Sequence, residues 1–215
     1  VGSSTYTLSG TNTYSGNTTI SAGTIKLTGS VNALTDLSIA SGATLDLQST
    51  QTFATLDLNG TITRSAGSSE LTITGTSDIG GSITTSGSQT YSGAVTLSGG
   101  DRILTGTIVN FGSTLAGGAN ALTITGNVDL DGAATNLSTL AVSSTSNLGA
   151  NVTTSSTQTY SGAVTLSTDV TLTTTDSNIT FSSTVDGDGT SRDLTLTLGS
   201  GSASITGIVG TTSLA

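Results

Sequence analysis

Apolar side chains alternate with Thr, Ser or Asp along almost the whole chain. The alternation is clear in Thr44–Leu47, Leu71–Thr74, Val95–Leu97, Leu122–Thr125 and Leu194–Leu198. A period of two that is rich in Thr, Val and Ile is typical of strands with one buried face. No segment keeps apolar residues at helical spacing for three turns. The pattern therefore predicts an all-β protein with almost no helix.

Glycine-containing dipeptides punctuate the strands. They include Asn59-Gly60, Gly80-Gly81, Ser92-Gly93, Gly117-Gly118 and Ser161-Gly162. Gly and Asn tolerate positive φ angles, so we interpret these positions as sharp corners. Corners about every seven to twelve residues fit two architectures, an antiparallel sandwich and a parallel coil in which each turn stacks on the last.

Internal repeats favour the coil. The sequence QTYSGAVTLS occurs twice, at Gln89–Ser98 and at Gln158–Ser167, and a looser copy, NTYSGNTTIS, begins at Asn12. The similarity extends back to Ser77 and Ser146 without a gap. A solenoid repeats its sequence because each turn is the same structural unit, whereas a sandwich has no such reason.

The repeat also gives an expected geometry. Gln158 follows Gln89 by 69 positions. With about 23 residues in a turn, this distance is three turns, and the chain forms about nine turns in a rod roughly 45 Å long. Val95 and Leu97 should then lie on the same face as Val164 and Leu166 and point inward. Thr96 and Thr165 should point outward.

Composition supports this fold and limits the chemistry. The chain has no Cys, His, Met, Trp or Pro, and only 8% of its residues are charged. Few aromatics and much Ser and Gly are also a signature of disorder, but the regular period and the absence of Pro favour a folded chain. A net charge of −9 argues against nucleic acid or an anionic membrane as partner. No apolar run reaches the ~18 residues that a membrane-spanning helix needs.

Two parts of the chain resemble known bacterial surface proteins. Gly10–Leu27, GTNTYSGNTTISAGTIKL, resembles the passenger-associated strand repeat of bacterial autotransporters. The segments QTYSGAVTL, ITFSSTVDG and RDLTLTLGSGSASITGIVG resemble repeats of filamentous-haemagglutinin-like adhesins. The resemblance implies a right-handed parallel β-helix on the outside of a Gram-negative cell.

Catalysis is not expected. Without His or Cys, the usual nucleophile–base pairs cannot form. Paired carboxylates remain as candidates, because some β-helix enzymes cleave polysaccharides with Asp residues. The candidate pairs are Asp129 with Asp131 and Asp186 with Asp188. Since aromatics and bases that would hold a sugar are scarce, we predict no catalytic, cofactor-binding or metal site.

Calcium binding is the other candidate chemistry. Asn127–Gly132 matches the first half of an EF-hand loop, but Ser138 occupies the twelfth position, where a bidentate Glu is required. Residues 185–189, VDGDG, resemble acidic glycine turns but lack the nonapeptide calcium motif. Solvated acidic corners are the favoured interpretation of both.

Other polar residues are assigned structural roles. Tyr14, Tyr91 and Tyr160 recur at one place in the repeat. Stacking on a ligand is conceivable, but we expect them to pack at corners with their hydroxyl groups in water. Arg102 and Arg192 each follow or precede an Asp, Asp101 and Asp193, and we expect weak surface pairs.

These observations predict one β-solenoid segment over residues 1–215, a non-catalytic rod or stalk in a longer extracellular or cell-surface fibre or adhesin. The sequences near both ends, Thr5–Leu8 and Ile205–Val209, are strand-like and carry no obvious cap. The expected partners are therefore neighbouring repeats or copies of the chain joined end to end, with no nucleic acid and no membrane insertion. The alternative is a carbohydrate-active or carbohydrate-binding β-helix protein.

Overall fold

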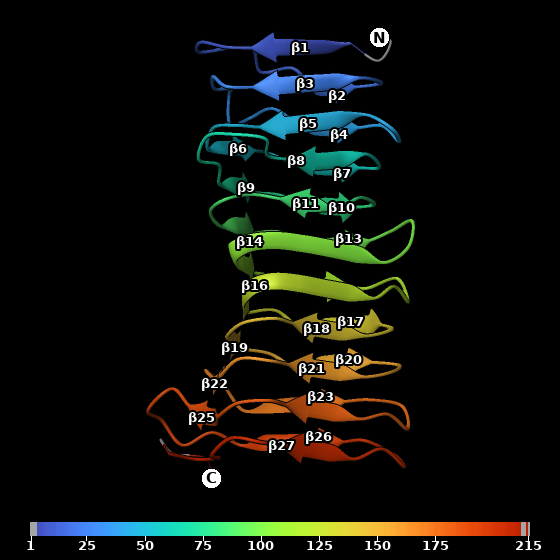
Figure 1. Cartoon of the computed structure of the whole chain (residues 1–215), viewed down its shortest axis with the longest axis vertical. Helices are drawn as coiled ribbons and strands as arrows, with labels where there is room; N and C mark the ends of the chain where they lie inside the picture. The colour runs from blue at the N-terminus through green and yellow to red at the C-terminus, as the bar shows by residue number, and fades with distance from the viewer. Residues whose placement is uncertain (1–3, 212–213, 215) are drawn as a thin grey trace.

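The chain coils into a parallel β-solenoid of about ten turns, which are stacked one on another along a single axis (Figure 1). The computed structural model describes residues 4–211 and 214. These residues form 27 strands and no helix, and therefore no helix that could cross a membrane. Every strand pairing among them is parallel. The all-β, parallel architecture predicted from the alternation and the repeats is confirmed.

Successive strands fall into three columns, which we call faces 1, 2 and 3. Face 1 contains β1 (Thr5–Leu8), β3 (Thr24–Leu27), β5 (Thr44–Leu47), β8 (Thr61–Thr63), β11 (Ile83–Thr84), β18 (Leu140–Val142), β21 (Gln158–Tyr160), β24 (Ile179–Phe181) and β27 (Ala203–Ile205). Face 2 contains β6 (Gln51–Phe53), β9 (Leu71–Ile73), β12 (Gln89–Tyr91), β19 (Ser146–Leu148), β22 (Val164–Leu166) and β25 (Val185–Gly187). Two long strands, β14 (Arg102–Phe111) and β16 (Leu122–Leu130), run across faces 1 and 2.

Face 3 is a separate sheet of ten strands. They are β2 (Thr18–Ile20), β4 (Leu37–Ile39), β7 (Leu56–Leu58), β10 (Ser77–Ile79), β13 (Val95–Leu97), β15 (Leu115–Ala116), β17 (Ala134–Leu137), β20 (Val152–Thr154), β23 (Val170–Thr173) and β26 (Leu194–Thr197). Most strands on the three faces are short, because a corner follows almost at once.

The turns are less uniform than the sequence suggested, and there are more of them. On face 1, Thr44 pairs with Thr61 in the next turn, whereas Ile179 pairs with Ala203, so the second of these turns takes up more of the chain. The expected turn of about 23 residues is therefore not kept along the chain, and the chain forms about ten turns where about nine were expected. The strands fix the repeat in space, but the corners between them accommodate segments of different length.

The core is a set of apolar columns that run parallel to the solenoid axis. On face 1 one column passes through every turn, and each member is in register with the next. Its members are Tyr6, Ile25, Leu45, Ile62, Ile83, Leu104, Ile124, Val142, Tyr160, Phe181 and Ile205. From Leu45 to Phe181 these side chains are at most 2% exposed. Stacked aliphatic and aromatic side chains thus exclude water from the interior, which stabilises the coil by burial of apolar area.

The inward and outward phase of the repeat is as predicted. Val95, Leu97, Val164 and Leu166 are at most 1% exposed, while Thr96 and Thr165 point outward. The prediction that both pairs share a face was wrong. Val95–Leu97 lies on face 3 and Val164–Leu166 on face 2, because the interval between the two copies is not a whole number of turns.

Candidate functional site

Asp129 sits in the middle of a ladder of polar side chains on the outside of face 2. Asn110, Asp129 and Asn147 are in register on three successive turns. The Nδ2 groups of Asn110 and Asn147 donate to the two carboxylate oxygens of Asp129, each at 2.9 Å. Asp131 lies beyond the end of β16 and is exposed. Since amides of the protein already engage both oxygens of Asp129, its carboxylate ties three turns together.

A shallow hollow of about 200 Å³ lies over this ladder. Its lining comes from β14, β16, β22 and the segment that leads into and includes β19, and consists of Ile108, Asn127, Val128, Asp129, Thr145, Ser146, Asn147 and Thr165. The lining holds one carboxylate with amide and hydroxyl groups around it, and no aromatic ring or base. This arrangement offers hydrogen bonds to a polar ligand but no second carboxylate for general acid–base chemistry.

The second candidate pair, Asp186 and Asp188, is also used within the protein. Asp186 accepts a hydrogen bond from the Thr211 hydroxyl at 2.7 Å. Asp188 forms an ion pair with Arg192 at 2.8 Å and accepts the Thr190 N–H. The hydrogen bond from Arg192 is the main cause that lowers the pKa of Asp188 to about 2. Asp188 is therefore ionised at neutral pH and has no proton to donate as a general acid.

The calcium candidates do not form a cage. Residues 127–130 belong to the extended strand β16, with Asn127 and Asp129 outward and Val128 and Leu130 inward. An EF-hand loop must instead curl around its ion. The Asn127 side-chain oxygen accepts the Thr145 N–H of the next turn. Within residues 4–211 and 214, no group of three or more acidic side chains is placed to hold a metal ion.

Two stacked carboxylates were missed by the sequence analysis. Asp57 on β7 and Asp78 on β10 are in direct register on the outside of face 3. Asn59 donates to Asp57 at 2.9 Å, and the Ser98 hydroxyl donates to Asp78 at 2.5 Å. Like charges on adjacent strands repel each other, so these neighbouring donors offset an unfavourable pairing. The signal in the sequence was a spacing of one turn between the two acids, which can be recognised only when the turn length is known.

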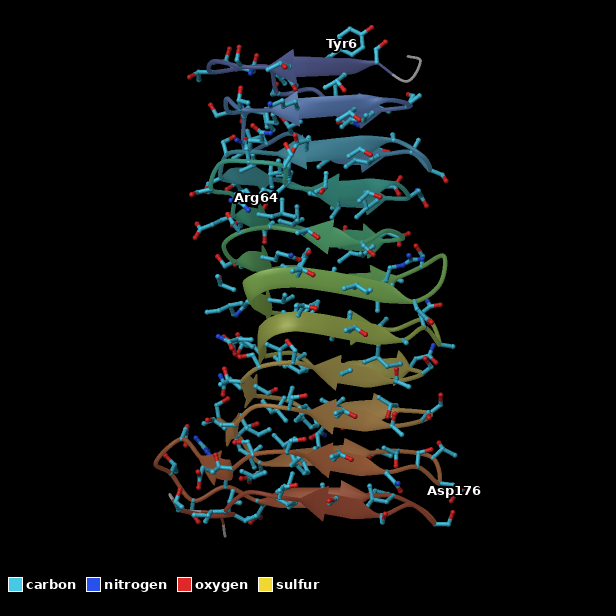
Figure 2. All side chains as sticks on the ribbon, viewed as in Figure 1. Tyr6, Arg64 and Asp176 are labelled. Carbon is cyan, nitrogen blue, oxygen red and sulfur yellow. The ribbon has the colours of Figure 1, made fainter. Side chains whose placement is uncertain are left out.

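Corner residues use side-chain oxygens to bind the backbone of the next turn. Asp101 accepts the N–H of Ala121, Asn151 that of Thr171, and Asp176 that of Ser200, all at 2.7–2.9 Å. Asp176 has a φ of 49° and lies at an outer corner near the last turns (Figure 2). Its hydrogen bond from the Ser200 backbone lowers the pKa of its carboxyl group. Asp101 and Asp176 therefore use their carboxylates to hold neighbouring turns together at the corners.

The predicted Arg–Asp neighbour pairs were wrong. Arg102 donates to the carbonyl oxygen of Ser98 instead of pairing with Asp101, at 2.7 and 2.9 Å. Arg192 pairs with Asp188, four residues earlier, and not with Asp193. The Asp101 carboxylate instead accepts the N–H of Ala121 in the next turn.

The repeated phrase builds a buried polar network. The Tyr91 hydroxyl donates to Gln89 Oε1 at 2.9 Å, and Gln89 Nε2 donates to the carbonyl oxygen of Thr105 at 2.8 Å. In the second copy Tyr160 donates to Gln158 at 3.0 Å, and Gln158 donates to Thr173 at 2.9 Å. The two tyrosines and the two glutamines are 0% exposed. The expectation of solvated hydroxyl groups was therefore wrong for Tyr91 and Tyr160.

Each buried tyrosine also stacks on a phenylalanine of the next turn. The ring centroids lie 5.5 Å apart for Tyr91 and Phe111 and 5.2 Å apart for Tyr160 and Phe181. Burial raises the pKa of both tyrosines. Tyr14 of the loose copy differs: it is 41% exposed, and its hydroxyl lies 2.9 Å from that of Thr18. The tyrosine of the motif is therefore buried in the two exact copies, where neighbouring turns cover it on both sides, and not in the loose copy.

The chain was compared with known proteins at the level of family, sequence and structure. It matches no protein-family model, and no curated protein or solved structure is significantly similar to it. The architecture itself is a parallel β-solenoid, which is compatible with β-helix repeat proteins.

Proposed function

We propose that this chain is a structural, non-catalytic segment of a bacterial extracellular or cell-surface fibre or adhesin, in which it acts as a rigid rod or stalk. The observation that carries the proposal is the placement of the two identical copies. Their inward side chains build the same buried network, but on different faces of the coil. A binding or catalytic site would need its outward residues on one face. The identical residues lie on different faces and share only their buried contacts, so their common role is to pack the core.

The side-chain hydrogen bonds support the same function. Corner and ladder residues connect each turn to the next, as Asp129 does for three turns and Asp176 for two. Such contacts oppose bending and separation of neighbouring turns. Eleven strands stack on face 1 when β14 and β16 are included, so ten spacings of ~4.8 Å give a rod roughly 48 Å long. The resemblance of Gly10–Leu27 to autotransporter passenger repeats is consistent with a place outside a Gram-negative cell.

Imaging, proteolysis and an assay on polysaccharides together test this proposal. Negative-stain images of the purified chain should show straight rods of uniform width, and limited proteolysis should leave most of the solenoid intact. Incubation with a panel of acidic and neutral polysaccharides should release no reducing ends. Compact particles without a long axis, or rapid digestion throughout, would contradict the rod.

A carbohydrate-binding or carbohydrate-active protein is the second candidate, favoured by the hollow that Asp129 and Asn147 line. Amides and a carboxylate at the base of a hollow can hydrogen-bond to sugar hydroxyl groups. Release of reducing ends, or oligosaccharide binding that Asp129→Asn weakens and the outward substitution Thr96→Asn on face 3 does not, would establish this candidate in place of the rod.

A further inference from the structure

Face 1 carries two outward columns of small polar side chains through the middle of the solenoid. They flank the inward column that runs from Ile62 to Phe181, one residue before it and one residue after it in each turn. Only Ile103 and Ala141 are neither Thr nor Ser. The first column is Thr61, Ser82, Ile103, Thr123, Ala141, Thr159 and Thr180, and the second is Thr63, Thr84, Thr105, Thr125, Ser143, Ser161 and Ser182. Figure 1 shows the strands β8, β11, β14, β16, β18 and β21 stacked one above another.

These two columns contain no charged side chain, whereas the outward columns of the other faces do. Asp129 and Asp186 point outward from face 2, and Asp57 and Asp78 from face 3. Two arginines adjoin the columns in the sequence, and each donates to a carbonyl oxygen of its own corner, Arg64 to that of Gly67 and Arg102 to that of Ser98. Face 1 therefore presents an uncharged polar surface between β8 and β24.

The hydroxyl groups of the two columns are available to water. Within residues 4–211 and 214, the side chains of Thr61, Thr63, Thr123 and Thr125 make no hydrogen bond to the protein. Threonine is branched at Cβ and its χ1 angle is restricted, so stacked threonines on a sheet present their hydroxyl and methyl groups in a repeating arrangement. Water molecules that are hydrogen-bonded to these hydroxyl groups repeat with the same arrangement.

This arrangement is periodic in two directions. Neighbouring turns of the solenoid are ~4.8 Å apart, and residues two positions apart along a strand are ~6.7 Å apart. Because the strands are parallel and in register, both spacings are kept from one turn to the next. Oxygen atoms on the surfaces of hexagonal ice form a grid with repeats close to these two distances. The water that the columns hold therefore resembles a layer of the ice lattice.

We propose that face 1 binds the surface of ice through the two columns between Thr61 and Ser182. The hydroxyl groups hold a layer of water with the repeats of the lattice, and the methyl groups of the threonines fill the spaces between them. The proposal goes beyond the function as a rod. It uses only turns that are covered by other turns on both sides, so it holds for this segment in a chain of any length.

A crystalline polysaccharide also presents a regular surface, but the columns lack the groups that suit one. Aromatic rings pack on the faces of sugar rings, and amides or carboxylates form paired hydrogen bonds with sugar hydroxyl groups. Neither occurs in the two columns, which contain hydroxyl groups, one isoleucine and one alanine. Single hydroxyl groups on a rigid grid are better matched to water.

Slow freezing of a dilute solution of the full chain tests this binding. The chain should be retained in the growing ice, and osmometry should show a gap between the melting and freezing temperatures together with faceted crystals. The double variant Thr123→Lys/Thr125→Lys should lower the amount retained at least ~tenfold, since each lysine brings a strongly hydrated charge into the grid.

The matched control is Thr90→Lys/Thr153→Lys, which makes the same change of charge on faces 2 and 3. Thr90 is half-buried, like Thr123, and Thr153 is exposed, like Thr125. The control should be retained like the parent chain, and circular dichroism confirms that both variants are folded.

Three results would overturn the proposal. They are exclusion of the parent chain from ice without a gap in temperature, an equal loss of retention in the control, and binding to microcrystalline cellulose or chitin without retention in ice. The last would identify face 1 as a surface for polysaccharide instead. None of these results changes the shape seen in negative stain, so each would leave the rod function standing.

Discussion

The two copies of QTYSGAVTLS have one sequence and two locations. In the first, Gln89–Tyr91 lies on face 2 and Val95–Leu97 on face 3. In the second, Gln158–Tyr160 lies on face 1 and Val164–Leu166 on face 2. The hydrogen bond from tyrosine to glutamine is nevertheless almost the same, 2.9 Å long in the first copy and 3.0 Å in the second. The phrase therefore encodes a strand, a corner and a second strand, and it does not encode a position around the coil.

The loose third copy shows what the phrase requires from its surroundings. Tyr14 lies near the first turn and is 41% exposed, whereas Tyr91 and Tyr160 have covered surroundings and are 0% exposed. Its sequence has Asn12 where the other copies have Gln, so the buried amide partner is absent as well. The motif becomes a core element when turns stack on both sides and the Gln-x-Tyr pair is present.

The largest effect is expected from a charge in the apolar columns of either exact copy. Leu97→Asp and Leu166→Asp should each lower the free energy of unfolding by about 3–5 kcal/mol, because each leaves an unpaired carboxylate in a dry interior. Thr96→Asn and Thr165→Asn, one residue earlier and outward, should change it by less than about 0.5 kcal/mol, because they add no charge beside Asp78 and Asp186, which are in register with these positions. Urea unfolding followed by circular dichroism measures both. A large cost at the Thr positions would show that the inward phase is wrong.

This phase was predictable from the sequence, and the turn length was not. A period of two places Val95 and Leu97 on one side of a strand and Thr96 on the other, whatever face the strand occupies. The number of residues in a turn depends on the length of its corners. Thr44 pairs with Thr61 in the next turn, whereas Ile179 pairs with Ala203, which is further along the chain. Backbone hydrogen bonds between strands form in short and long turns alike, so the alternation of apolar and polar residues does not reveal the length of a turn.

The candidate sites were found by residue type, but their roles depended on neighbours one turn away. Asp129 stood out as an acid, whereas its partners Asn110 and Asn147 belong to the preceding and the following turn. Tyr91 and Tyr160 were expected to pack at corners with their hydroxyl groups in water. A buried phenol needs a hydrogen-bond partner. Gln89 and Gln158 supply that partner. The pair Gln-x-Tyr is the signal that could have placed the tyrosines inside.

A second comparison concerns the corner glycine of each copy. A Cβ added to Gly93 would overlap the backbone of Gly75, and one added to Gly162 would overlap the backbone of Ser144. Gly16, at the same place in the loose copy, has nothing within 4 Å of such a Cβ. Gly93→Ala and Gly162→Ala should each destabilise by about 2 kcal/mol, and Gly16→Ala should have almost no effect. Thermal or urea unfolding of the three variants checks this; equal effects at all three would mean that stacking turns do not restrict the corner.

Alkaline pH should weaken the contribution that the two buried tyrosines make to stability. Burial raises the pKa of Tyr91 and Tyr160 above the value near 10 that an unfolded chain has. The unfolded state then loses protons first, so their contribution is complete below about pH 10 and is lost as the pH rises further. Each buried tyrosine should add about 1.4 kcal/mol of lost stability per pH unit there.

Substitution by phenylalanine isolates this dependence. Above about pH 10, the unfolding free energy of the Tyr91→Phe/Tyr160→Phe variant should fall less steeply with pH than that of the parent chain. Stability curves at several pH values between 8 and about 11.5, within the range where tyrosine titrates, provide the measurement. A double variant with the same slope as the parent would show that the hydroxyl groups are in contact with water.

The smallest effect is expected at a defect shared by the two longer repeats that begin at Ser77 and Ser146. Ser77 and Ser146 occupy the same place in the repeat, on faces 3 and 2, and their hydroxyl groups are buried without a hydrogen-bond partner. Each points into an apolar column, next to Val95 and Val164 respectively. An unsatisfied buried hydroxyl is costly, so Ser77→Ala and Ser146→Ala should each stabilise the protein by up to about 1 kcal/mol. Ser69→Ala should have the opposite effect. The buried Ser69 hydroxyl accepts a hydrogen bond from the Ser86 N–H, so its removal should lower the free energy of unfolding. Urea midpoints that rise for the first two and fall for the third would show that the two repeats contain the same packing defect on two different faces. A fall at Ser77 or Ser146 would mean that the hydroxyl is satisfied in solution.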